Sequence, residues 1–249
     1  MYLFTIKTKP DVCIEVDTLI PEKLEGLKEK EVKNLTIREG KKEVKVEELF
    51  EVEEIEGVLT FKGKWLDRVK KIGFNMKKGE IYVDGDVGMY LGAFMKGGKI
   101  IVNGNVDRFA GMNMSGGEIE IVGSAGDYLG SAYRGDYGMK GGKIKVNGDA
   151  GNEVGIKMRG GEIIVKGKAG MFFGGMINGG LLRAYEAIRA GANMKSGTIV
   201  LERVEEVLPG FIYLGKDKFE NEVYHVFEGD KAVKKSNGRL YVREIGENK

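Results

Sequence analysis

The sequence GEIYVDGDVGMYLGAFMKGG at residues 79–98 decides the fold, because its pattern of glycines and apolar residues returns along the chain. With the second glycine of each Gly-Gly pair, or its equivalent, as origin, successive copies are 19, 19, 25, 19 and 19 residues apart. Of the 40 glycines, 28 lie between Gly79 and Gly180. A fixed period indicates a repeat architecture rather than a flexible linker. The origins are Gly79, Gly98, Gly117, Gly142, Gly161 and Gly180, with looser copies at Gly57 and Gly197.

Each copy begins with a predicted strand. Apolar residues stand two and four positions after the origin, as Ile81 and Val83 do in the quoted copy. This alternation is typical of a strand with one buried face. A Gly-x-x-Gly-x-x-x-Gly segment follows, as at Gly85, Gly88 and Gly92, and a methionine usually stands three residues before the next origin. The glycines therefore predict tight turns between short strands.

One copy carries Asp107 where the middle glycine of this segment should stand. Aspartate adopts a left-handed backbone more readily than most residues do. We therefore expect a positive φ at the middle position of every copy.

The repeat predicts a mainly β protein built as a parallel β-helix, a solenoid of about eight coils of ~19 residues. A propeller blade would need about 40 residues, and the leucine-rich signature is absent. We expect an N-terminal mixed α/β cap over 1–56, the β-helix over 57–202 and a small β extension over 203–249. Residues 181–190 lack glycine and suggest a helix, as does the segment 21–35. Short strands are expected at Tyr2–Lys7, Val12–Val16, Phe211–Leu214, Val223–Phe227 and Leu240–Val242.

Composition excludes several classes of function. The 249 residues carry 40 Lys and Arg against 38 Asp and Glu, a net charge of +2, far from the basic surplus of a nucleic-acid-binding protein. No apolar run approaches ~18 residues, so no membrane span is predicted. The start of the sequence has no apolar signal segment, and a cytoplasmic protein is expected. Abundant Lys and Glu without glutamine suggest a thermophile.

This chain has few residues that could bind a metal or a cofactor. Cys13 and His225 are its only cysteine and histidine. A zinc site usually takes at least two such ligands, and an iron–sulfur cluster takes four. The G-x-G-x-x-G fingerprint of dinucleotide sites is also absent. We therefore expect no catalytic, cofactor-binding or metal-binding residue here.

A carbohydrate-active β-helix enzyme is an alternative of a different class. Such an enzyme would need acidic residues and arginine gathered along one strand face. The outward mid-strand positions instead form a mixed, partly apolar row, which suits a packed interface better. This row contains Tyr82, Ile101, Glu120, Lys145 and Ile164.

The 25-residue interval contains an insertion. Its six extra residues lie between Gly130 and Met139, and loops leaving a regular repeat often carry binding contacts. Tyrosine and arginine are enriched at interface hot spots. Tyr133, Arg134 and Asp136 are therefore the candidate interface residues. The alternative is a solvated loop with an internal Arg134–Asp136 pair.

These motifs resemble the C subunit of formylmethanofuran dehydrogenase, tungsten or molybdenum type. The repeats share the G-x-x-G-x-x-x-G coils and Met-x-Gly-Gly corners of that family, and the insertion shares its YRGD. The segment IEVDTLIPEKLEGLKEKEVKNLTIREGKKEVKVEELFEVE resembles its N-terminal part, and PGFIYLG, FEGDKAV and NGRLYV resemble its C-terminal part. The repeat alone is shared with the wider superfamily that includes the C-terminal β-helix of the glutamate synthase large subunit.

The resemblance implies a non-catalytic scaffold subunit in an archaeal oxidoreductase complex. That complex reduces CO2 with methanofuran to formylmethanofuran, the first step of CO2-based methanogenesis. The partners it implies are a subunit with a tungsten or molybdenum bis-pterin, a zinc amidohydrolase-like subunit and ferredoxin-like iron–sulfur subunits. Two related alternatives stay open. One is a stand-alone glutamate synthase β-helix domain, and the other is the homologous subunit of a bacterial formyltransferase/hydrolase complex.

Overall fold

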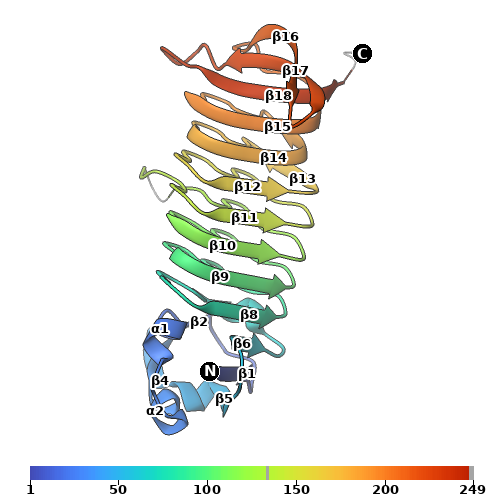
Figure 1. Cartoon of the computed structure of the whole chain (residues 1–249). Coiled ribbons are helices and arrows are strands. Elements are labelled where there is room, and N and C mark those ends of the chain that lie inside the picture. Colours follow the sequence, from blue (N-terminus) through green and yellow to red (C-terminus); the bar gives the residue numbers. More distant parts are fainter. Residues whose placement is uncertain (133–134, 247–249) are drawn as a thin grey trace.

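The computed structural model describes residues 1–132 and 135–246 of the chain. Strands dominate it, and most of them stack one above another in sequence order (Figure 1). The prediction of a mainly β protein is confirmed. The stacked parallel strands are β6 (Leu59–Lys62), β8 (Glu80–Asp84), β9 (Lys96–Asn103), β10 (Gly116–Ile121), β11 (Lys143–Val146), β12 (Glu162–Val165), β14 (Asn178–Ile188) and β15 (Ser196–Val204).

The repeat period sets the register of this sheet. Ile100 pairs with Ile81 on one side and with Ile119 on the other, and Ile119 pairs in turn with Ile144. Residues at equivalent positions of successive copies therefore lie directly above one another. All four isoleucines are buried, so each copy adds one layer to a continuous apolar core. We call each copy of the repeat a rung.

Consecutive rungs are also joined outside the strands. A second file of parallel bridges runs from Val87 through Val106 to Ala125 and beyond. On the side of the turns, the Gly92 N–H donates to the Ile72 carbonyl at 2.8 Å in the preceding rung. The Phe94 N–H donates to the Met112 carbonyl in the following rung at 2.7 Å. Backbone polar groups thus find partners above and below, as buried amides require.

The expectation of a positive φ at the middle glycine is wrong. Neither Gly88 nor Asp107 adopts one, whereas the last glycine, Gly92, does at +58°. A Cβ at Gly88 would lie 2.7 Å from the Asp67 carbonyl oxygen and 2.8 Å from that of Val69. Close approach to the preceding rung, and not handedness, therefore explains glycine at this position.

The helix expected over 181–190 is also wrong, because this segment belongs to β14. Strand β14 pairs in parallel with β12 on one side and β15 on the other. Leu182 and Ala184 alternate inward on it and are buried. The two neighbouring strands override the helical propensity of the Leu and Ala residues.

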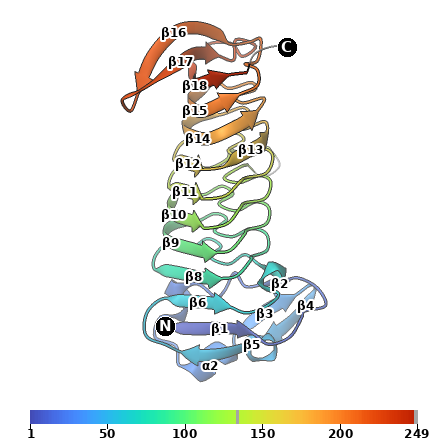
Figure 2. The same cartoon turned by 90° about the vertical axis from the view of Figure 1, so that its right-hand side faces the viewer.

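The N-terminal segment packs against the first rungs (Figure 2). Strand β1 lies between β5, to which it is antiparallel, and β6, to which it is parallel. The segment 21–35 forms two short helices rather than one. The elements are β1 (Tyr2–Ile6), β2 (Ile14–Glu15), α1 (Pro21–Leu24), α2 (Glu29–Lys33), β3 (Thr36–Glu39), β4 (Lys42–Lys45), α3 (Val46–Leu49), β5 (Phe50–Glu54), the 3-10 turn Leu66–Arg68 and β7 (Val69–Lys70).

The C-terminal segment extends the same sheet, first by a strand parallel to β15 and then by an antiparallel hairpin. Strand β18 (Gly238–Ile245) pairs in parallel with β15, and the hairpin of β16 (Ile212–Phe219) and β17 (Glu222–Gly229) follows it outward. The short β13 (Lys168–Met171) pairs with the end of β14. The strands predicted at both ends of the chain are confirmed, and those of the C-terminal segment are longer than expected. No helix in the described part of the chain is long and apolar enough to cross a bilayer.

Acid is expected to weaken the C-terminal strands through Glu228. Its carboxylate accepts hydrogen bonds from Lys231 and Arg239, which lower its pKa to about 2 from an ordinary 4.5. A lowered pKa contributes stability above pH 4.5 that is lost as the pH falls toward 2. Urea unfolding should therefore show Glu228→Gln to be less stable than the wild type at neutral pH and equal to it in strong acid. A constant difference across this range would contradict the assignment, and Glu244→Gln serves as the control.

Candidate interaction surface

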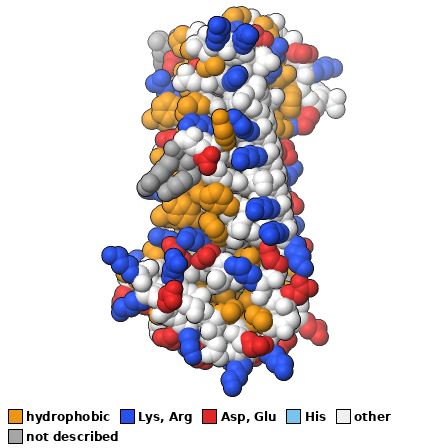
Figure 3. Space-filling model, turned by 90° about the vertical axis from the view of Figure 1, so that its left-hand side faces the viewer, with side chains coloured by type: hydrophobic (Ala, Val, Ile, Leu, Met, Phe, Trp, Pro, Cys, Tyr) orange, Lys and Arg blue, Asp and Glu red, His pale blue; other side chains and the backbone are white. Residues whose placement is uncertain are grey.

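Two hollows adjoin one another on the side of the turns that precede the strands. The half-buried Phe74 and Phe94 line both, and their ring centroids lie 5.4 Å apart. Figure 3 shows hydrophobic side chains gathered on this face on both sides of the grey segment. The first hollow, of about 350 Å³, is also lined by Glu15, Lys71, Tyr90 and Met112. The second, of about 420 Å³, is also lined by Asn75, Lys96, Asn113, Ser115, Asp136 and Lys140.

Four aromatic residues of this face stand at left-handed backbone positions, whereas Phe74 does not. Tyr90, Phe109 and Tyr128 have φ of 68°, 66° and 65°, and Phe94 has 58°. A left-handed non-glycine residue costs roughly 1–2 kcal/mol. The hydrogen bonds between rungs hold the backbone in this conformation, at two positions in the rung that carries Tyr90 and Phe94.

Three of these aromatic residues form a stacked column. The rings of Tyr90 and Phe109 are 5.1 Å apart, those of Phe109 and Tyr128 are 4.8 Å apart, and both pairs lie within 9° of parallel. The negative charge of Glu153, together with burial and a hydrogen bond, raises the pKa of Tyr128. The Tyr128 phenol is therefore neutral at physiological pH.

Asn113 closes the larger hollow beside the insertion. Its side chain is buried, and its Nδ2 donates to the Tyr137 carbonyl at 2.6 Å. Its Oδ1 has no hydrogen-bond partner among the described residues. A buried acceptor without a hydrogen-bond donor costs about 1–3 kcal/mol.

The predicted interface residues meet this surface at one position. Asp136 is exposed and lines the larger hollow together with Lys140. Tyr133 and Arg134 lie outside the described residues, so their role and the internal Arg134–Asp136 pair stay predictions. Sequence reasoning missed Phe94 and Asn113. The signal that could have found them is their place directly before the buried methionine of the rung.

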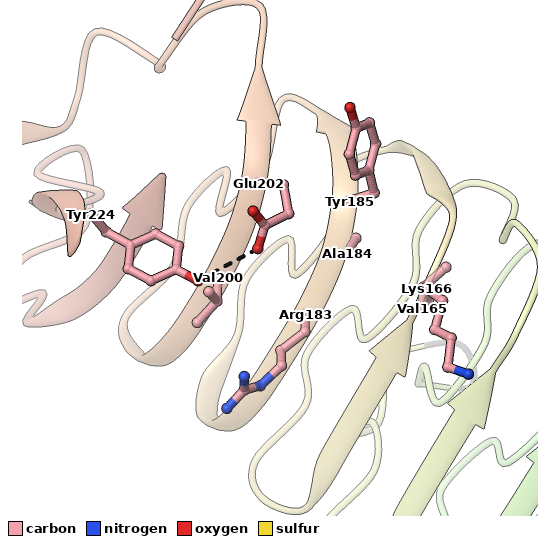
Figure 4. A pocket seen from close by; sticks show the side chains of 8 residues that line it. All are labelled: Val165, Lys166, Arg183, Ala184, Tyr185, Val200, Glu202 and Tyr224. Carbon is pink, nitrogen blue, oxygen red and sulfur yellow. Dashed lines mark hydrogen bonds between the residues drawn. The ribbon is translucent and has the colours of Figure 1, made fainter. Parts of the chain in front are cut away.

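A smaller groove of about 200 Å³ lies at the C-terminal end of the stack (Figure 4). Its charged groups are largely paired: Arg183 with Glu220, and Glu202 with Arg243 at 3.0 Å. The Arg183 guanidinium also lies 5.0 Å from the Phe219 ring, in the β16–β17 hairpin. Figure 4 shows the side chains of Arg183 and Lys166 pointing away from each other. These two cations therefore do not form a common anion site. The contacts of Arg183 with Glu220 and Phe219 hold the hairpin against the sheet.

Metal-binding geometry is absent from the described residues, where no three His, Cys, Asp or Glu side chains lie close enough to share an ion. Cys13 is partly buried, and His225 shares a hydrogen bond of 3.1 Å with the Tyr213 hydroxyl.

A stack of glycine-cornered rungs, with aromatic and basic side chains on one face, defines a glycine-rich β repeat protein. The chain belongs to the GXGXG motif family, whose model matches residues 33–208.

The similar curated proteins are the C subunits of formylmethanofuran dehydrogenases. The one from the tungsten-containing enzyme 2 of Methanococcus maripaludis is 39% identical over 92 residues, which are 36% of this chain and 34% of that protein. The one from the molybdenum-containing enzyme 1 of Methanothermobacter thermautotrophicus is 43% identical over 94 residues, 36% of this chain and 23% of that protein. The chain thus matches about a third or less of the length of these relatives. The resemblance to these C subunits is confirmed.

A solved structure matches almost the whole chain. It is a chain of the formyltransferase/hydrolase complex of Methylorubrum extorquens, determined with methylofuran bound. The likeness covers 97% of this chain and 99% of that one, with a TM-score of 0.89 and 26% identity. The flanking segments therefore share the neighbour's fold as well as the repeats.

Proposed function

We propose that this chain is the scaffold (C) subunit of a formylmethanofuran dehydrogenase, the complex that reduces CO2 with methanofuran to formylmethanofuran. The observation that carries the proposal is a structural likeness over nearly the full length to a subunit of a formyltransferase/hydrolase complex. The identity of 39% and 43% to the tungsten and molybdenum enzymes favours the dehydrogenase. The same full-length likeness makes a formyltransferase/hydrolase complex the second candidate.

The physical role follows from a parallel β-helix, which we infer for residues 57–202. The inference is supported by pairing between rungs on the strand side, at the Val87–Ala169 bridges and at the turns. A rung bonded to both neighbours on every side resists bending and shear. Such a rod, with a cap over 1–56 and an extension over 203–249, holds large partner subunits at a fixed separation.

The redox and hydrolytic chemistry belongs, on this proposal, to the partner subunits. Cys13 and His225, as the only Cys and His, supply too few ligands for an iron–sulfur cluster or a typical zinc site. The bis-pterin tungsten or molybdenum, the zinc and the iron–sulfur clusters are therefore assigned to other subunits. This chain contributes position, and its own residues take no part in bond breaking.

Affinity purification of the chain at native expression level from its host tests the proposal. Mass spectrometry should identify a pterin-metal subunit and a zinc amidohydrolase-like subunit in equal amounts, with tungsten or molybdenum and zinc in the eluate. Formyltransferase and hydrolase subunits without tungsten or molybdenum would establish the second candidate. Recovery with FMN-binding synthase proteins would indicate a glutamate synthase component. A chain recovered alone would contradict every scaffold role.

A further inference from the structure

A file of unpaired cations runs along the face that carries the two hollows. In most rungs the residue directly after the buried methionine is basic, and neighbouring rungs are about 4.8 Å apart. Within residues 1–132 and 135–246, none of these cations forms an ion pair with a carboxylate. The file consists of Lys77, Lys96, Lys140, Arg159 and Lys195.

On the strand face, by contrast, lysines pair with carboxylates of neighbouring rungs. There Lys143 pairs with Glu162 at 2.9 Å and Lys145 with Glu120 at 3.7 Å, across neighbouring rungs. Like charges in adjacent rungs repel one another. Acidic residues alternating with basic ones would relieve this repulsion on the turn side, as they do on the strand face. The file therefore adds positive potential to this face, which Asp136 in the larger hollow and Glu15 in the smaller one offset only in part.

The cations border the apolar hollows. Lys96 stands two residues after Phe94, and Lys96 and Lys140 line the larger hollow with Phe74 and Asn113. Figure 3 shows Lys and Arg side chains beside the hydrophobic groups of this face. The aromatic-walled hollow matches the apolar centre of a protein interface, and the cations at its rim match the polar border of such an interface.

We infer that this face, here called the Phe94 face, docks an acidic ridge of a partner subunit. The ridge places one apolar side chain between Phe74, Phe94 and Asn113. Its carboxylates lie opposite Lys96 and Lys140. The inference rests on the proposed function and adds the face that is used and the chemistry of the partner.

The arrangement of the cations favours a protein rather than a nucleic acid as the occupant. The cations form a single file, and the chain has a net charge of only +2, whereas a nucleic-acid surface is broadly basic. The aromatic rings Tyr90, Phe109 and Tyr128 also stack on one another and leave their faces largely covered. Bases therefore have little free ring surface on which to stack.

The test compares matched variants of the tagged chain, purified from the host with its partners. Phe94→Asn removes the aromatic wall and keeps the left-handed backbone, since asparagine stands at the equivalent positions 75 and 113. Lys96→Glu with Lys140→Glu reverses the rim charge. The controls are Tyr185→Ala and Lys166→Glu, an exposed aromatic residue of β14 and an exposed lysine directly after β12.

We expect Phe94→Asn and the double charge reversal each to lower the recovery of partner subunits at least tenfold, with melting temperatures close to the wild type. The controls should stay within twofold. Wild-type recovery should fall as salt rises, and a photo-crosslinking amino acid at position 94 should capture a partner subunit.

Two results would overturn the inference while the proposed function stands. They are full recovery of partners by both variants, and crosslinking of position 94 to a second copy of this chain. Association that nuclease abolishes would replace the protein partner with a nucleic acid. A wild-type chain that recovers no partner would overturn the proposed function and the inference together.

Discussion

Replacing Gly117 with alanine should destabilise the protein by about 3 kcal/mol or more, the range reached when a core is overpacked and a backbone strained. Gly117 has a φ of +88°, which alanine adopts only at a cost. A Cβ there would also lie 2.6 Å from Met95 Cε, 2.7 Å from the Gly98 carbonyl oxygen and 2.8 Å from the Gly97 carbonyl carbon. The neighbouring rung would have to move away, and with it the hydrogen bonds on both sides.

Gly26→Ala is the matched control for this prediction. Gly26 has nearly the same φ, +82°, but a Cβ there would meet no atom within 4 Å. Only the backbone strain remains, so we expect a loss of about 1–2 kcal/mol. Urea unfolding followed by circular dichroism measures both variants. Equal losses at the two positions would show that contact between rungs does not select glycine at Gly117.

Phe61→Ala should lower the free energy of unfolding by about 3–5 kcal/mol, the usual loss for a fully buried phenylalanine. Phe61 in β6 is completely buried, stacks on Phe4 of β1 at 5.1 Å and meets Phe50 of β5 at 6.4 Å. These three rings join the N-terminal segment to the first rung. Removing one leaves a cavity at the place where the exposed end of the stack is covered.

Phe74→Ala separates core packing from surface packing in the same experiment. Phe74 is only partly buried, so its loss should cost less than half as much stability as that of Phe61. Phe74→Ala should instead weaken partner recovery, because Phe74 lines both hollows of the Phe94 face. A similar stability loss in both variants would contradict the separation.

The sequence was informative about the stack because each rung repeats one local rule. The 19-residue period predicts that Ile100 pairs with both Ile81 and Ile119, and this register is observed. The prediction of a positive φ at Asp107 was wrong. The spacing of glycines does not distinguish a glycine needed for a left-handed backbone from one needed for close contact with a neighbouring rung. The helix expected at 181–190 was wrong for a related reason. Its strand exists through pairing with two partners distant in the chain.

The candidate surface was harder to predict than the stack. Asp136 was singled out by the insertion, whereas Phe94 and Asn113 owe their orientation to left-handed backbone positions that only the hydrogen bonds between rungs define. The hollow itself combines residues from the segments 74–75, 94–96, 113–115 and 136–140. No single stretch of the sequence contains it, so its parts are recognised only once the rungs are placed above one another.

The insertion has a consequence for how this protein can change over evolution. Six extra residues stand between β10 and β11, yet Ile119 still pairs with Ile144 and Ile121 with Val146. Growth of a loop at a rung corner therefore leaves the pairing of the strands intact. A contact surface at one corner can therefore be gained or lost without a change in the strands. On the proposed function, partner specificity and folding are in this way inherited separately.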